Sequence, residues 1–139
     1  DGYRMLARID GDDVRLFTRN GHDWSAKLPH QVEALKALGL DSAWLDGEMV
    51  VADESGVADF QALQAAFDSE HDDDITYYLF DLPYLGGKDL RELPVQDRRA
   101  TLARLLKHNT SAILKFSEDF NHNLSISFNL LISIVFVKY

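Results

Sequence analysis

Two carboxylates stand close together in the apolar segment 44–51, at Asp46 and Glu48. Side chains of a β-strand alternate between its two faces, so these carboxylates share a face roughly 7 Å apart, opposite Leu45 and Met49. Like charges on one face of a strand lower its stability unless a cation, a metal ion or a sugar hydroxyl interacts with them. The segment therefore predicts a ligand-binding carboxylate pair. The alternative is a strand with one solvent-exposed face.

Three arginines near the start of the chain could bind phosphate. Arg4 and Arg8 share a face of one predicted strand, and Arg19 ends the next strand beside an Asn-Gly turn. A guanidinium group binds phosphate oxygens in a planar, bidentate arrangement. The alternative is that these arginines form surface ion pairs with the many acids of the chain.

Phe80 is a third candidate for ligand binding. It lies in a strand-like run, on the same predicted face as Tyr78 and Leu82. A flat aromatic ring at such a position can stack on a planar base. The alternative, which applies to most aromatic residues in strands, is a place in the hydrophobic core.

The composition excludes several classes of protein. The chain has 139 residues, of which 46% are hydrophobic and 27% charged, and this indicates one globular domain rather than a disordered or coiled-coil protein. It has no cysteine, which excludes disulfide scaffolds, cysteine-ligated zinc and cysteine nucleophiles. A formal net charge of −9 argues against a nucleic-acid coat or a basic membrane binder. The histidines show no metal-binding spacing, and no glycine-rich phosphate loop is present.

Hydrophobic periodicity and turn residues predict the elements that position these candidates. Strands are expected at 3–9, 14–19, 43–51 and 75–82, and helices at 28–38, 59–67 and 94–106. The first two strands should form a hairpin around 10–13. The helix capped by Asp59 should bury Phe60 with its other apolar residues, and the acidic segment 68–74 should be a solvated loop. The predicted fold class is α+β with a mainly antiparallel sheet and packed helices.

The segment 119–139 differs from the rest of the chain. Residues 120–137 contain no Asp, Glu, Lys or Arg, but polar residues interrupt the run, and its apolar part is shorter than the ~20 residues of a membrane span. Alternation of apolar and polar residues predicts strands here instead. We therefore expect no membrane segment, and a charge-poor tail at 119–139 behind a main unit at 1–118.

Four motifs, taken in order, resemble the covalent nucleotidyltransferase superfamily. The resemblance is strongest to the ATP-dependent DNA ligases, in particular the ligase domain of bacterial end-joining ligase D, and it covers about residues 1–118. The motifs are Asp1-Gly2-Tyr3-Arg4, Phe17-Thr18-Arg19-Asn20-Gly21, Leu45-Asp46-Gly47-Glu48 and Tyr78-Leu79-Phe80-Asp81-Leu82.

The resemblance implies part of an ATP-grasp-like adenylation domain and a three-step reaction. In that family a lysine attacks the α-phosphate of ATP, releases pyrophosphate and forms a Lys–AMP phosphoramidate. The AMP then passes to a 5′-phosphate at a nick, and the 3′-hydroxyl displaces it and seals the strand. The implied cofactors are ATP, as the AMP donor, and Mg²⁺, which spreads the phosphate charge.

The resemblance also implies roles for individual residues. Arg4 and Arg19 would contact the phosphate and ribose of the nucleotide or nick. Glu48, with Asp46 beside it, would hold the ribose hydroxyl or the metal ion, and Phe80 would stack on adenine.

No catalytic residue is expected within this sequence. The family position of the nucleophilic lysine falls two residues before Asp1, and the chain alone is expected not to adenylate itself. Lysines at other positions do not match the motif: Lys27, Lys36, Lys88 and Lys107.

The implied partners are nicked or broken double-stranded DNA, a Ku-type end-binding protein, and polymerase or phosphoesterase domains on the same or another chain. The implied location is the bacterial cytoplasm, at the nucleoid. Three alternatives stay open: an RNA ligase or capping-type nucleotidyltransferase, a nucleotide-binding module that never forms the adduct, and a metal hydrolase built on Asp46, Glu48 and Asp81.

Overall fold

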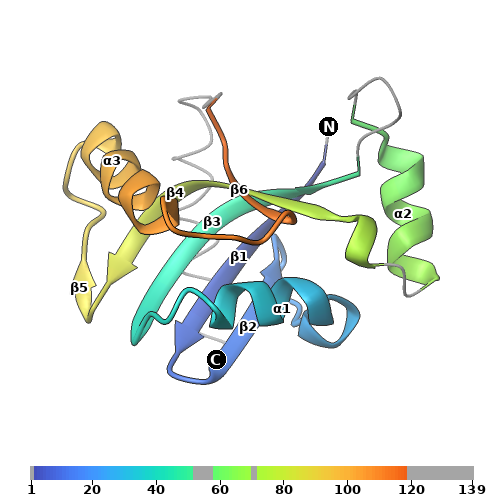
Figure 1. Ribbon diagram of the computed structural model, residues 1–139, viewed down its shortest axis with the longest axis horizontal. Helices are drawn as coiled ribbons and strands as arrows, with labels where there is room; N and C mark the ends of the chain where they lie inside the picture. The colour runs from blue at the N-terminus through green and yellow to red at the C-terminus, as the bar shows by residue number, and fades with distance from the viewer. Residues whose placement is uncertain (1, 52–57, 70–71, 119–139) are drawn as a thin grey trace.

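A twisted sheet forms the centre of the computed structural model, which describes residues 2–51, 58–69 and 72–118 (Figure 1). Within these residues the sheet has six strands: β1 (Tyr3–Asp10), β2 (Asp13–Thr18), β3 (Ser42–Val50), β4 (Thr76–Leu85), β5 (Lys88–Asp89) and β6 (Leu114–Phe116). The helices are α1 (Pro29–Lys36), α2 (Phe60–Asp68) and α3 (Val95–Leu106), with short 3₁₀ turns at η1 (Ser25–Lys27) and η2 (Asp72–Asp74).

The strand order is β2-β1-β3-β4-β5, with β6 paired to β4. Every pairing is antiparallel except β4 with β6, which is parallel. The predicted α+β class with a mainly antiparallel sheet is therefore confirmed. The predicted hairpin is also confirmed, because β1 and β2 pair up to Asp10 and Asp13 around the turn.

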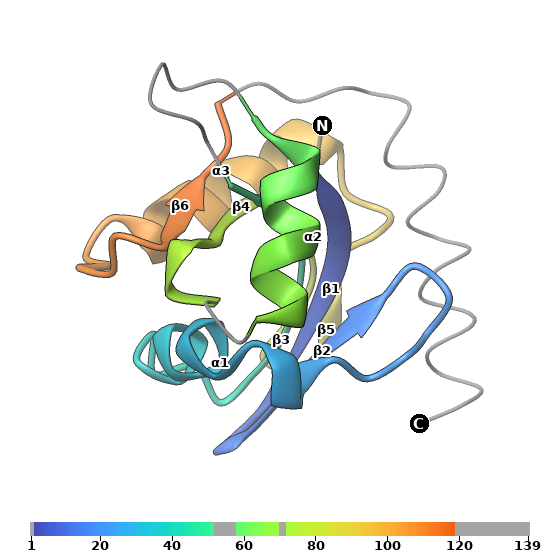
Figure 2. The ribbon, with the colours of Figure 1, turned by 90° about the vertical axis from the view of Figure 1, so that its right-hand side faces the viewer.

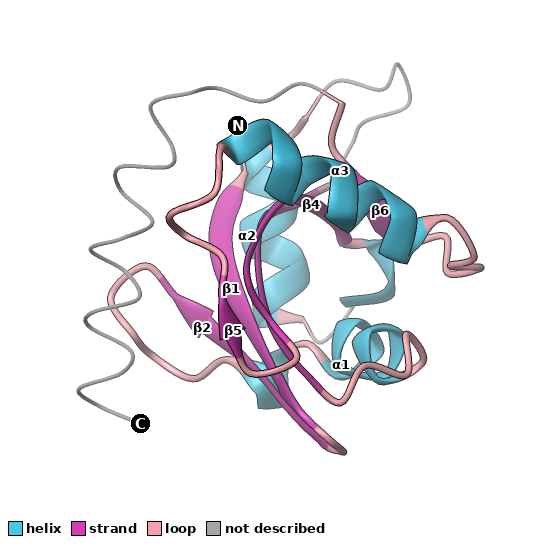
Figure 3. Cartoon of the chain, turned by 90° about the vertical axis from the view of Figure 1, so that its left-hand side faces the viewer, coloured by secondary structure: helices cyan, strands magenta, loops and turns pink. Residues whose placement is uncertain are grey.

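The helices gather on one side of the sheet and enclose the main hydrophobic core (Figures 2 and 3). Alternate residues of β1 and β3, including Met5, Ala7 and Leu45, point into this core. Each helix contributes buried apolar side chains to it: Ala34 and Leu35 from α1, Leu63, Ala66 and Phe67 from α2, and Leu102 and Leu106 from α3.

The opposite face of the sheet carries the polar candidates. Arg4 lies across from Glu48, and Leu6 lies across from Asp46, in the antiparallel pairing of β1 with β3. Directly opposed residues project from the same face of a sheet, so both carboxylates and Arg4 share one face. The core helices pack against the other face, and on this face Leu6 and Phe17 form a second, smaller buried cluster.

Strand β4 carries an irregularity at Phe80. Gly47 of β3 pairs with Leu79, whereas the preceding Asp46 pairs with Asp81, so Phe80 is an extra residue in the ladder. An extra residue bends the strand and changes the direction of its side chain. The register shift therefore sets the direction of Phe80.

The helix starts and ends predicted from the sequence agree with the structure. Pro29 starts α1, and Gly39, with φ of +69°, follows its end. The carboxylate of Asp59 caps α2 by accepting a hydrogen bond from the Ala62 N–H at 3.0 Å. Pro94 immediately precedes α3, so the predicted start of this helix also agrees with the structure.

Two local predictions were wrong. The acidic segment is not simply a solvated loop, because Asp72 is buried and accepts hydrogen bonds from the backbone N–H of His30 at 2.7 Å and bonds to its ring Nδ1 at 2.8 Å. The partner of this buried carboxylate is a backbone N–H at the start of α1, and the run of acidic residues in the sequence did not reveal it. Phe60 is not buried with α2; it is 46% exposed.

Other predictions differ only in extent or lie outside the described residues. Strand β4 runs to Leu85, three residues further than expected, and the short strands β5 and β6 carried no clear sequence signal. The strands expected in 119–139 lie outside the described residues. Among the helices of the described ranges, none combines the length and apolarity needed to cross a bilayer.

Gly47 marks a close approach of three strands. A methyl group at Gly47 would lie 2.4 Å from the carbonyl oxygen of Tyr78 and 2.6 Å from Cε1 of Tyr77. Tyr77 is fully buried, and its hydroxyl donates a hydrogen bond to the carbonyl of Met5 on β1 at 2.7 Å. The tyrosine therefore links β4 to β1 past β3, and the glycine provides the space.

We predict that Gly47→Ala lowers the free energy of unfolding by at least about 2 kcal/mol, because the new methyl group overpacks a rigid site. Urea denaturation measures this loss. Ser42→Ala, at the start of the same strand, is the control and should change stability by no more than about 0.5 kcal/mol. Equal midpoints for Gly47→Ala and the unmodified chain would contradict the packing role of Gly47.

Candidate functional site

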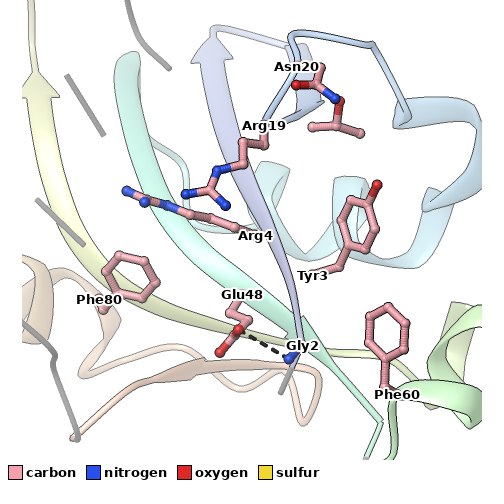
Figure 4. Close-up of a pocket in the computed structure, with 9 residues that line it drawn as sticks. Gly2, Tyr3, Arg4, Arg19, Asn20, Glu48, Phe60 and Phe80 are labelled. Carbon is pink, nitrogen blue, oxygen red and sulfur yellow. Dashed lines mark hydrogen bonds between the residues drawn. The ribbon is translucent and has the colours of Figure 1, made fainter. Parts of the chain in front are cut away.

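A cavity of about 340 Å³ opens on the face of the sheet that carries the polar candidates (Figure 4). Its walls come from β1, the turn after β2, β3, β4 and the start of α2. Nine residues line it: Gly2, Tyr3, Arg4, Thr18, Arg19, Asn20, Glu48, Phe60 and Phe80. The structure thus places four of the six candidate site residues around one cavity. Asp46 lies beside the cavity without lining it, and Arg8 does not line it either but forms an ion pair with Asp13.

Arg4 and Asp46 form a buried ion pair between β1 and β3. The Arg4 side chain is 9% exposed and that of Asp46 fully buried. Nε of Arg4 donates to Oδ1 of Asp46 at 3.2 Å, and Nη2 donates to Oδ2. This bidentate contact holds Arg4 in a fixed orientation at the cavity, so the carboxylate predicted to be a ligand positions an arginine.

Burial, together with the negative charge of the neighbouring Asp81, raises the pKa of Asp46 to about 7. The Arg4 guanidinium and the backbone N–H of Gly47 act in the opposite direction but do not outweigh the loss of hydration. The alternative of a strand with one solvent-exposed face fails for Asp46, which is fully buried. Arg4 is the cation that balances the negative charge of the Asp46 carboxylate.

Phe80 forms one wall of the cavity and is 5% exposed. The guanidinium carbon of Arg4 lies 5.6 Å from the centroid of its ring, a distance at which a cation–π attraction operates. Figure 4 shows Phe60 on the other side of the cavity. The cavity therefore has a flat aromatic wall beside a cationic group.

Glu48 lines the cavity, and the backbone of Gly2 holds its carboxylate. The backbone N–H of Gly2 donates to Oε1 of Glu48 at 3.2 Å. A Cβ at Gly2 would lie 2.7 Å from Cγ of Glu48 and 2.4 Å from the carbonyl oxygen of Met49. The absence of a side chain at Gly2 is what allows this contact.

Arg19 reaches the cavity from an ordered turn. The N–H of Gly21 donates to the carbonyl of Thr18 at 2.8 Å, and the N–H of His22 donates to the Thr18 hydroxyl at 3.1 Å. Arg19 itself is exposed, and its guanidinium lies near that of Arg4 (Figure 4). Two guanidinium groups thus line the same cavity, one from β1 and one from the turn after β2.

Sequence reasoning did not single out Tyr3, Phe60, Thr18 and Asn20 as site residues. Tyr3, Thr18 and Asn20 stand inside recognised motifs, so motif membership was a signal for them. The Tyr3 ring stacks on Trp24 with centroids 5.1 Å apart, which fixes one wall of the cavity. Phe60 had no comparable signal, because its helical spacing matched that of a core residue.

The metal-hydrolase alternative finds no support in the described residues. Asp46 and Asp81 lie opposite each other on β3 and β4, but Arg4 binds the first, and Arg98 binds the second at 2.9 and 3.2 Å. Within the described ranges, no three acidic, histidine or cysteine side chains are grouped so as to hold a metal ion.

A family model described as the ATP dependent DNA ligase domain matches residues 1–128. The chain belongs to the ATP-dependent DNA ligase family. The protein-family match includes all four motifs, and the structural class of the sheet agrees with the nucleotidyltransferase domains of solved ligases.

The curated relatives include end-joining ligases. Over 117 residues the chain is 54% identical to the multifunctional non-homologous end joining protein LigD of Pseudomonas aeruginosa, covering 84% of this chain and 14% of that protein. It is 35% identical over 118 residues to a probable DNA ligase of Saccharopolyspora erythraea, covering 82% and 23%. The chain therefore spans less than a quarter of the length of these relatives.

Solved structures agree with the sequence comparisons. The ligase domain of Mycobacterium tuberculosis LigD matches with a TM-score of 0.70 and 33% identity, over 96% of this chain and 43% of that chain. A mycobacterial DNA ligase D complexed with ATP and MES matches with a TM-score of 0.66 and 31% identity, over 96% and 42%.

We predict that Arg4→Leu lowers the free energy of unfolding by about 3–5 kcal/mol at pH 8, because it leaves a buried carboxylate without its cation. Without the guanidinium, the pKa of Asp46 should rise beyond about 7. When the pKa of a carboxyl is higher in the folded than in the unfolded state, the free energy of unfolding falls as the pH rises from the unfolded-state pKa through the folded-state pKa. The deficit relative to the unmodified chain should therefore be smaller at pH 6 than at pH 9, measured by urea denaturation.

Arg8→Leu is the matched control for this prediction. Arg8 lies on the same strand and pairs with Asp13, whose side chain is 49% exposed, at 2.8 Å. A solvent-exposed pair contributes up to about 1 kcal/mol, so its loss should be small and nearly independent of pH over this range. Similar deficits in the two variants would show that the Arg4 pair is not energetically distinct.

Proposed function

We propose that this chain forms the nucleotide-binding part of an ATP-dependent DNA ligase adenylation domain. The observation that supports this most is the common cavity: Arg4, Arg19, Glu48 and Phe80 come from four separate segments and meet around one space. An aromatic wall, two guanidinium groups and one carboxylate are complementary to a base, its phosphates and its ribose.

Each side chain has a proposed role in binding ATP. Phe80 stacks on adenine, and Arg4 and Arg19 bind the phosphates of the nucleotide or of the nick. Because Asp46 fixes Arg4, that guanidinium is oriented before the ligand arrives, which reduces the entropy lost on binding.

Glu48 is the proposed partner of the ribose hydroxyl or of Mg²⁺. Mg²⁺ in proteins is held by one or two carboxylates together with substrate phosphates, and Glu48 beside two phosphate-binding arginines fits that pattern. Mg²⁺ would supply charge neutralisation at the phosphates. Asp46 as a second metal ligand stays a prediction; in the structure its two oxygens bond to Arg4.

The proposed reaction is nick sealing through Lys–AMP and DNA-adenylate intermediates. The domain assignment of 1–118 as part of an adenylation domain, with 119–139 as a divergent tail, belongs to the same proposal. The nucleophilic lysine is assigned to the position two residues before Asp1.

The proposed substrate is nicked or broken double-stranded DNA, in double-strand-break end joining. The relative from Pseudomonas aeruginosa is named a non-homologous end joining protein, which supports this assignment over an RNA ligase or a capping enzyme. A Ku-type protein, and polymerase or phosphoesterase domains, are the proposed partners. The proposed location is the bacterial cytoplasm, at the nucleoid, where such DNA is found.

We predict that Phe80→Leu weakens AMP binding about 5- to 150-fold, because base stacking on an aromatic ring contributes about 1–3 kcal/mol. Isothermal titration calorimetry with the full 139-residue chain measures this. Phe80→Trp, which keeps a flat ring, is the control and should retain binding. Unchanged affinity in Phe80→Leu would remove Phe80 from the proposed base site.

We predict that the chain binds ATP reversibly and forms no covalent adduct with α-labelled ATP and Mg²⁺ that survives SDS. None of its lysines occupies the motif position of the nucleophile. An adduct on the 139-residue chain itself would refute the assignment of the nucleophile.

A further inference from the structure

Helix α3 directs a guanidinium at the backbone of Phe80. Nη1 of Arg99 donates a hydrogen bond to the carbonyl oxygen of Phe80 at 2.7 Å. Phe80 is the extra residue at the β3–β4 register shift, where the regular pairing of the ladder is interrupted. The contact therefore fixes the backbone at the point from which the Phe80 ring projects.

The same guanidinium binds the end of β6. Nη2 of Arg99 donates to the carbonyl oxygen of Ser117 at 2.8 Å, and its guanidinium carbon lies 4.7 Å from the centroid of the Phe116 ring. Burial lowers the pKa of Arg99, but an arginine remains charged at neutral pH. One cation thus joins the bulge of β4 to the neighbouring parallel strand.

Its neighbour Arg98 has a different environment. Arg98 is 8% exposed, binds both oxygens of Asp81, and also donates to the carbonyls of Arg91 and Leu93. Its loss would leave a buried carboxylate unpaired and affect folding first. Arg99 binds carbonyl groups instead, so its loss should alter local geometry more than global stability.

We propose that Arg99 is a positioning residue for the nucleotide base: it holds the bulge of β4 so that the Phe80 ring faces the cavity in the orientation that stacks on adenine. This inference rests on the proposed function. Arg99 does not line the cavity, so its influence on a ligand would pass through Phe80. The phosphate-binding arginines lie on other segments, and their contacts should not depend on Arg99.

The test is a double-mutant cycle on AMP affinity, measured by calorimetry on the full 139-residue chain. Arg99→Leu should weaken AMP binding about 3- to 10-fold, a part of the stacking contribution. In the Phe80→Leu background the same substitution should have no further effect, because the ring it positions is absent. Arg99→Lys, which keeps one donor, should restore part of the affinity.

Arg104→Leu is the matched control. Arg104 lies on the same helix, is exposed, and donates to the Thr101 hydroxyl at 3.1 Å. It should leave AMP affinity unchanged. Thermal unfolding of every variant separates loss of fold from loss of positioning, and if Arg99→Leu does not fold, Arg99→Lys and Arg99→Gln take its place in the cycle.

The outcomes separate this inference from the proposed function. If AMP binding depends on Phe80 but not on Arg99, or if Arg99→Leu weakens binding equally with and without the Phe80 ring, the positioning role is refuted and the base site stands. If the unmodified chain fails to bind AMP, or Phe80→Leu has no effect, both proposals are refuted.

Discussion

The cavity depends on a buried ion pair between two strands. Asp46 is fully buried at the centre of the sheet, and an ionised carboxylate there is unfavourable without a partner. Arg4, which contacts Asp46 through two hydrogen bonds, supplies that partner from the adjacent strand. The pair also orients Arg4 beside the Phe80 ring, 5.6 Å from its centroid. The need to pair the buried Asp46 carboxylate therefore places the Arg4 guanidinium in the wall of the cavity.

Rigid elements support the aromatic wall as well. Tyr77 extends past Gly47 to bind β1, which locks three strands together immediately before the β4 register shift. After it, Arg98 of α3 holds Asp81. Phe80 is thus fixed on both sides by contacts that its own strand cannot provide. A site built on strands and braced in this way keeps its geometry better than one built on loops.

The sequence predicted local elements well and long-range partners poorly. The hairpin, the cap at Asp59 and the ends of α1 rest on neighbouring residues, so periodicity and turn chemistry were enough. The carboxylate of Asp72 was misjudged because its partner, His30, lies 42 residues away. Family motifs named four of the residues that line the cavity, but no pattern could say that Asp46 binds Arg4 or that Phe60 lies at the cavity.

The net charge of −9 is compatible with an anion-binding site, because charge acts locally. Several acids are already paired with arginines, including Asp13 with Arg8 and Asp89 with Arg91. At the cavity, Arg4 and Arg19 bring two guanidinium groups to a space whose described lining residues include one carboxylate, that of Glu48. The cavity is therefore locally more cationic than the net charge of the whole chain suggests.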